Sequence, residues 1–219
     1  ISMHRYYLGA TLVSLSTITI PPTTGQAPIG TIVCLHGYGA NAQDLASLAP
    51  YLNLYEYQFI FPDAPFPHPQ VPGGKAWYNL ENYDGLTESQ QILTDWISSL
   101  ENNTGVPLSR TILSGFSQGG AMTLDVGLKF PLAGLVSLSG YLHSGAAQTK
   151  LDSFPPVLIV HGFQDMVVPL NAARKARTTL TNLGVAVEYQ EFNMGHEVTL
   201  EVLSLMRSFV LQVISPVDS

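Results

Sequence analysis

The chain has 219 residues, of which 46% are hydrophobic and only 11% are charged, whereas an ordinary soluble domain carries about 25% charged residues. So much apolar material in a chain of this length excludes disorder of the whole chain and predicts a substantial buried core. The formal net charge is -7 and no run of basic residues occurs, which argues against a nucleic-acid partner. No apolar stretch approaches the roughly 18 residues of a transmembrane helix.

Three features bear on the origin and the location of the protein. Ile1 and Ser2 precede Met3 and resemble a remnant of cloning. Cys34 is the single cysteine and lies inside an apolar run, so we expect a small core residue there and no internal disulfide. The N-terminus lacks the continuous apolar core of a secretory signal. Together these features predict a cytoplasmic location.

The pattern of apolar residues predicts a mostly parallel sheet. The segment from Tyr6 to Ile20 is rich in Thr, Val, Ile and Tyr, which favours one or two antiparallel strands at an edge. From Gly30 onward, short apolar runs alternate with amphipathic ones, which is typical of a parallel sheet with helices on both faces. The segment from Val185 to Phe192 alternates and is expected near the other edge. Buried strands are predicted at residues 31–35, 57–61, 111–113, 135–138 and 157–160.

Helices are predicted between these strands. Thr87 and Gln90 form a plausible capping box before an apolar stripe that continues to Leu100. A second stripe over residues 173–183 is followed by Gly184, a residue type that commonly ends helices. The last helix is expected from about Glu197 to Ile214. Because nothing marks a linker, we expect one α/β domain over residues 1–219.

One long segment departs from this pattern. The stretch from Pro62 to Gly85 contains five prolines and no periodicity. Loops of this length in compact domains are usually functional or mobile. We therefore interpret residues 62–85 as a Pro-rich loop at the active site.

The strongest chemical signal is the run Gly115-Phe116-Ser117-Gln118-Gly119, between a predicted strand and a predicted helix. A G-x-S-x-G run in that context is typical of a nucleophile elbow, where the serine occupies a strained turn above a sheet. Side chains at the two outer glycines would collide with neighbouring backbone. A serine that only caps a helix is the alternative. The strand before and the helix after favour Ser117 as a nucleophile.

A serine nucleophile needs a base and an orienting acid, which follow it in the order Ser, Asp, His in this type of enzyme. His196 is the one histidine that follows both Ser117 and a plausible acid in the chain. Asp165 lies a few residues past a predicted strand, at the same sheet edge as the elbow. Asp152 is the alternative acid, but it precedes its strand. Ser117, Asp165 and His196 are therefore the predicted catalytic residues.

The site also needs two donors for an oxyanion. The amide of Gln118, directly after the nucleophile, is one candidate. The amide of Tyr38, in the glycine-flanked loop after the first parallel strand, is the second. His36 in the same loop is expected to brace the turn backbone. No residue spacing indicates a metal site or a dinucleotide or phosphate loop, so we expect no cofactor and no metal.

The combined motifs resemble the phospholipase/carboxylesterase family, which includes acyl-protein thioesterases and lysophospholipase-like esterases. The resemblance implies a minimal α/β-hydrolase fold without a large cap domain, a Ser117, Asp165 and His196 triad, oxyanion donors at Tyr38 and Gln118, and hydrolysis of carboxylic esters or thioesters. It rests on six blocks in chain order, namely residues 35–39, 61–65, 77–78, 115–120, 161–169 and 195–196.

The Pro-rich loop is where the sequence departs from the better-known eukaryotic members of that family. Its aromatic residues Phe66, Trp77 and Tyr78 are predicted to contact substrate as a wall of the acyl pocket. A packed surface flap is the alternative.

The hypothesis is a serine carboxylesterase that acts on a small, lipid-like acyl ester or thioester, as a monomer or weak homodimer. The alternatives are an acyltransferase or a peptidase with the same triad, and a non-catalytic binding protein that kept the fold.

Overall fold

The computed structural model describes residues 15–145 and 153–214. Its centre is a seven-stranded sheet in the order β1-β3-β2-β6-β7-β8-β9, in which only the β1–β3 pairing is antiparallel. The mostly parallel α/β fold class is thus confirmed. The strands are β1 (Thr17–Ile20), β2 (Thr31–Leu35), β3 (Gln58–Pro62), β6 (Thr111–Phe116), β7 (Gly134–Leu138), β8 (Val157–Gly162) and β9 (Val187–Phe192).

The strands follow the apolar pattern closely. β2, β3, β7 and β8 are buried along their whole length, as continuous apolar runs predict. β9 alternates between half-buried and exposed residues and forms one edge. β1 forms the other edge, and the earlier part of its predicted segment lies outside the described residues. β6 extends to Phe116, beyond its predicted end, which carries the chain directly into the elbow.

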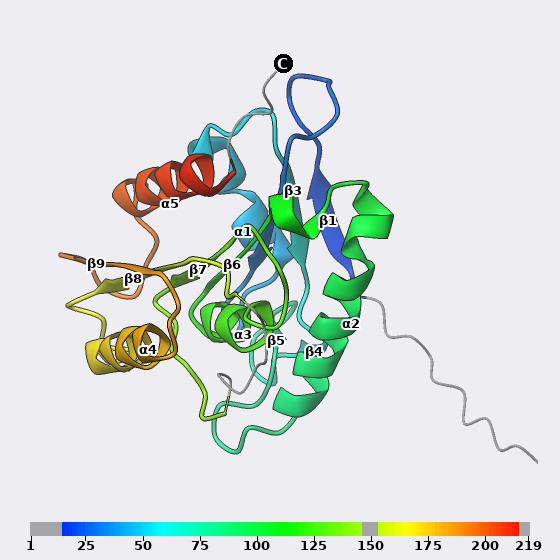
Figure 1. The fold of residues 1–219 in the computed structure, drawn as a ribbon. Helices are drawn as coiled ribbons and strands as arrows, with labels where there is room; N and C mark the ends of the chain where they lie inside the picture. The colour runs from blue at the N-terminus through cyan, green and yellow to red at the C-terminus, as the bar shows by residue number, and fades with distance from the viewer. Residues whose placement is uncertain (1–14, 146–152, 215–219) are drawn as a thin grey trace, which may run out of the picture.

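Helices cover both faces of the sheet. One apolar cluster joins the sheet to α2 (Leu86–Thr104), α3 (Gln118–Gly127) and α4 (Leu170–Asn182). A second joins the other face to α1 (Ala42–Ala46) and α5 (Leu200–Val213). Figure 1 shows the two covered faces at β8 and β9, which lie between α4 on one side and α5 on the other. No helix within the described residues is both long and apolar enough to cross a bilayer.

Two predicted helix starts were wrong. α2 begins after Gly85, which has a φ of 87° and offers no side-chain cap, so Thr87 lies inside the helix and forms no capping box. α5 begins at Leu200, where the hydroxyl of Thr199 accepts a hydrogen bond from the amide of Val202. In both cases the local sequence offers several polar residues that could begin the helix, and the cap that forms is another residue. α4 ends as predicted, before Gly184 with a φ of 84°.

The Pro-rich segment is more regular than its sequence suggests. It contains a small antiparallel ladder between β4 (Phe66–Pro67) and β5 (Lys75–Ala76). Short 3-10 turns also occur elsewhere, at Ala49–Leu52 and Leu108–Arg110. The ladder folds the loop back on itself, and its backbone is tied to the loop after β2 by hydrogen bonds between Gly39 and Lys75 and between Lys75 and Ala40.

Cys34 is buried in the second apolar cluster, as expected. Burial raises the pKa of its thiol to about 12, although a hydrogen bond with Ser114 acts in the opposite direction. The native protein should therefore leave Ellman's reagent unreacted at pH 8, because the thiolate is the reactive form. The thiol should react fully once the chain is denatured in guanidinium. Rapid reaction of the native protein would contradict this placement.

Candidate active site

Ser117 occupies the sharp turn between β6 and α3. Its φ of 56° and ψ of -118° lie outside the regions favoured by residues with a Cβ. Its amide donates to the carbonyl of Leu138 at 2.8 Å, which holds the turn against β7. A Cβ at Gly115 would lie 2.2 Å from the carbonyl oxygen of Gly119, and a Cβ at Gly119 would lie 2.2 Å from that of Leu35. The elbow thus requires both glycines, as the sequence predicts.

Replacing Gly119 with Ala should destabilise the protein by about 3 kcal/mol or more, because the added methyl group meets backbone that cannot move aside. Urea unfolding followed by circular dichroism would measure the change. Gly195→Ala is the matched control, since a Cβ there has no heavy atom closer than 3.9 Å. Equal stability of the two variants would contradict this account of the elbow.

The three predicted catalytic side chains meet in one hydrogen-bonded chain. His196 Nε2 lies 2.9 Å from Ser117 Oγ, and His196 Nδ1 lies 2.7 Å from Asp165 Oδ2. They come from the loops after β6, β8 and β9, at the carboxyl edge of the sheet, where parallel strands deliver their following loops to a common site. The histidine is oriented by the acid on one nitrogen and faces the serine hydroxyl on the other.

Asp165 is fixed by more than the histidine. Its Oδ1 accepts hydrogen bonds from the amides of Val167 and Val168, each at 2.8 Å. His161 Nε2, which also bonds the carbonyl of Val168 at 2.8 Å, lies 3.3 Å from Asp165 Oδ2. Burial alone would raise the pKa of Asp165, but the hydrogen bonds from His196 and the two amides outweigh it and hold the pKa below its ordinary value. Asp152, the alternative acid, lies outside the described residues.

Both predicted oxyanion donors border the same cavity as Ser117. Gln118 is the first residue of α3, so its amide has no acceptor within the helix and lies at the positive end of the helix dipole. Among the described residues, the Tyr38 amide has no hydrogen-bond acceptor either. Free amides beside Ser117 are what an oxyanion site at this serine would require. His36, fully buried, braces this loop by accepting from the Ala64 amide at 3.0 Å.

The three aromatic residues predicted to contact substrate take different positions. Trp77 is fully buried, and its indole N–H donates to the carbonyl of His36 at 3.0 Å, so it braces the site instead of lining the cavity. Tyr78 is also fully buried. Phe66 borders a neighbouring cavity of about 320 Å³, which Tyr38 and Tyr78 also line. The side chain of Gln118 ties this region to the elbow, accepting from the Trp77 amide and donating to the carbonyl of Tyr78.

The cavity at Ser117 has a volume of about 600 Å³ and is mostly apolar. From the Pro-rich loop, Leu80 lines it. Most of its walls come from the stretch Tyr141–Gly145, from Val167 and Val168 and from the inner side of α4. Sequence reasoning missed these walls. The one related signal was the apolar stripe over residues 173–183, which is equally typical of a face that packs against the core.

The described residues contain no cluster of three or more His, Cys, Asp or Glu side chains arranged to hold a metal ion.

Comparisons with known proteins show which family the chain belongs to and agree with its fold. Residues 22–214 match the model of the phospholipase/carboxylesterase family. The chain is 32% identical to an acyl-protein thioesterase 1 of Neurospora crassa, over 83% of this chain and 86% of the relative. It is 28% identical to an acyl-protein thioesterase 1 of Schizosaccharomyces pombe, over 91% and 97% of the two chains. The crystal structure of esterase PE8 superposes with a TM-score of 0.84 at 30% identity, covering 92% of this chain and all of that one. The chain belongs to the phospholipase/carboxylesterase family.

Proposed function

We propose that the protein is a serine carboxylesterase that hydrolyses carboxylic esters or thioesters of apolar acyl groups. The observation that carries this proposal is the continuous chain of hydrogen bonds from Asp165 through His196 to Ser117 at the edge of an apolar cavity. The names of the relatives support both ester and thioester substrates.

The reaction follows from the placement of the groups. His196 Nε2 takes the proton of Ser117 Oγ as this oxygen attacks the substrate carbonyl. The amides of Gln118 and Tyr38 donate to the oxyanion that forms. His196 then gives its proton to the departing alcohol or thiol, leaving an acyl-enzyme. Water, deprotonated by His196, attacks this intermediate and releases the acid and the free serine.

Asp165 keeps the imidazole in the tautomer that this sequence needs. By accepting from Nδ1–H, it leaves the Nε2 lone pair facing Ser117, and its negative charge stabilises the imidazolium formed during attack. The two amides on its other oxygen hold the carboxylate ionised, because they favour the charged form.

The test combines labelling with product analysis. A fluorophosphonate probe should label the protein covalently, and p-nitrophenyl acyl esters and acyl-CoA thioesters should be hydrolysed to free acids. A protein that binds acyl ligands but neither labels nor turns over would be a non-catalytic binder. Transfer of the acyl group to a competing alcohol in preference to water would indicate an acyltransferase, and cleavage of peptides would indicate a peptidase.

Three further assignments stay predictions. They are a cytoplasmic location, one domain over residues 1–219, and a monomer or weak homodimer that acts on small lipid-like substrates. Size-exclusion chromatography with light scattering would measure the oligomeric state.

A further inference from the structure

One wall of the triad cavity is held in an unusual way. Residues 141–145 line the cavity and begin three residues after the end of β7. Within the described chain, residues 140–145 take part in no backbone–backbone hydrogen bond. The described hydrogen bonds of these residues are two, and both are made by side chains, those of Tyr141 and His143. The hydrogen bonds that tie this wall to other described residues are thus made by side chains.

The interaction of His143 is a buried pair with a carboxylate. His143 Nδ1 lies 2.6 Å from Oδ2 of Asp125, whose side chain is fully buried in the last turn of α3. Gln90 of α2 donates to the same oxygen at 3.0 Å. A buried carboxylate is costly unless hydrogen-bonded, and an apolar residue would pack at this position without that cost. The pair connects the wall to the helix whose first residue, Gln118, borders Ser117.

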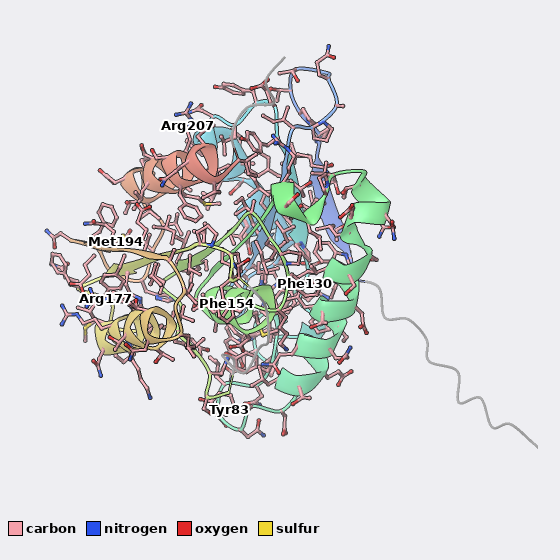
Figure 2. All side chains as sticks on the ribbon, in the orientation of Figure 1. Tyr83, Phe130, Phe154, Arg177, Met194 and Arg207 are labelled. Carbon is pink, nitrogen blue, oxygen red and sulfur yellow. The ribbon has the colours of Figure 1, made fainter. Side chains whose placement is uncertain are left out.

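Aromatic residues complete the attachment. The Tyr141 and Tyr78 hydroxyl groups are hydrogen-bonded to each other. The ring of His143 meets the rings of Tyr78 and Tyr141 edge to face, each with centroids 5.2 Å apart, and that of Tyr83 at 5.8 Å. Figure 2 shows Tyr83 in the loop before α2, at the end of the molecule below α3. Side chains from α3 and from the Pro-rich loop thus converge on His143, next to Tyr141 of its own stretch.

His143 is unsuited to act as a second base. Its Nε2 is buried and has no hydrogen-bond partner among the described residues, and its Nδ1 is engaged by Asp125. No substrate atom in the cavity could reach either nitrogen without movement of the wall. The imidazole is placed to orient, not to exchange a proton with substrate.

We propose that the Asp125–His143 pair determines acyl-chain selectivity by holding the 141–145 wall at a fixed position relative to Ser117. The proposal rests on the esterase function proposed above. Asp125 and His143 are positioning residues: they touch no reacting atom and act through the shape of the apolar cavity. A long acyl chain reaches the wall and gains contact with it, whereas an acetyl group stays beside the nucleophile.

The test is a chain-length series of p-nitrophenyl esters with Asp125→Ala, His143→Phe and the double variant. In each single variant the ratio of kcat/KM for the decanoyl ester to that for the acetyl ester should fall about tenfold, through a higher KM for the decanoyl ester. The double variant should lose no more than either single variant, because both remove the same interaction. The control Asp95→Asn, on the exposed side of α2, should keep the wild-type ratio. An unchanged ratio in both single variants would overturn the proposal, as would independent effects that add.

A rescue variant separates hydrogen bonding from volume. His143→Gln can still donate to Asp125 and should recover most of the decanoyl selectivity, whereas Phe fills the space without a donor. If Phe retained selectivity better than Gln, the pair would serve only to fill volume and the proposal would fail.

Proteolysis tests the role of the Asp125–His143 pair without any turnover of an ester, and so independently of the proposed function. Chymotrypsin should cleave after Tyr141 or Leu142 about tenfold faster in Asp125→Ala than in the wild type, because the released wall opens more often. If the wild type hydrolyses no ester at all, the proposed function fails. Unchanged cleavage in the variant would show that the pair does not hold the wall, whatever the activity.

Discussion

Replacing Ser117 with Ala is expected to lower kcat for p-nitrophenyl esters by at least about 10⁴-fold, while the protein stays folded. The hydroxyl oxygen is the atom that forms the acyl-enzyme, and no neighbouring group within the triad can replace it. The residual rate would come from the oxyanion donors and from binding alone. Initial rates under substrate saturation, together with loss of fluorophosphonate labelling, would measure the effect.

Folding and the identity of the nucleophile need separate controls. Alanine has a Cβ like serine, so it carries the same backbone strain at this turn and should leave the circular dichroism spectrum unchanged. Ser98→Ala, on the exposed side of α2, should keep full activity. Substantial turnover by Ser117→Ala would assign the reaction to another residue and remove the basis of the proposed mechanism.

Asp165→Asn is expected to lower kcat about 10⁴-fold, through the tautomer of His196. The two amides of Val167 and Val168 must keep an oxygen as their acceptor, so they fix the new amide with its NH₂ group toward His196. Nδ1 would then have to accept, which places the proton on Nε2 and leaves no lone pair for Ser117. Steady-state kinetics would measure the loss, with the exposed Asp95→Asn as control. A loss of less than tenfold would contradict an orienting role for Asp165.

The same substitution reports on the pKa of Asp165. Because the folded-state pKa is depressed, ionised Asp165 stabilises the native state above the ordinary carboxyl pKa of about 4. This stability is lost as the pH falls through the depressed folded-state value. The difference in unfolding free energy between wild type and Asp165→Asn should therefore be largest near pH 6 and shrink toward pH 2. Urea titrations at several pH values would test this, and a constant difference would contradict the assignment.

The hydrogen-bonded arrangement of Ser117, Asp165 and His196 could be predicted from sequence because these residues carry local signals or a fixed chain order. Ser117 is marked by flanking glycines whose need is steric, and the chain order then restricts the acid and the base to few candidates. The central strands were equally accessible, since strands buried on both faces are continuous apolar runs. These features depend on short stretches of chain.

The remaining features depend on contacts between distant segments. α2 begins directly after Gly85, which has a positive φ. Several polar residues nearby were also candidates for the helix start, so the sequence did not single out Gly85. Trp77 is buried, and its indole N–H donates to the carbonyl of His36, a partner far away in the sequence. The cavity wall at residues 141–145 carries no motif at all. Its attachment to Asp125 is visible only once α3 and the wall are placed together in space.

The triad is divided between parts of the fold that differ in burial. Ser117 precedes α3, in which every residue is buried, so the nucleophile can be displaced only by disrupting the core. His196 follows the edge strand β9, in which no residue is fully buried and which pairs with β8 alone. On heating, opening of this edge should separate the base from the nucleophile before the core melts. Thermal inactivation would then begin as a local and reversible event, at temperatures where the helix content of the protein is still intact.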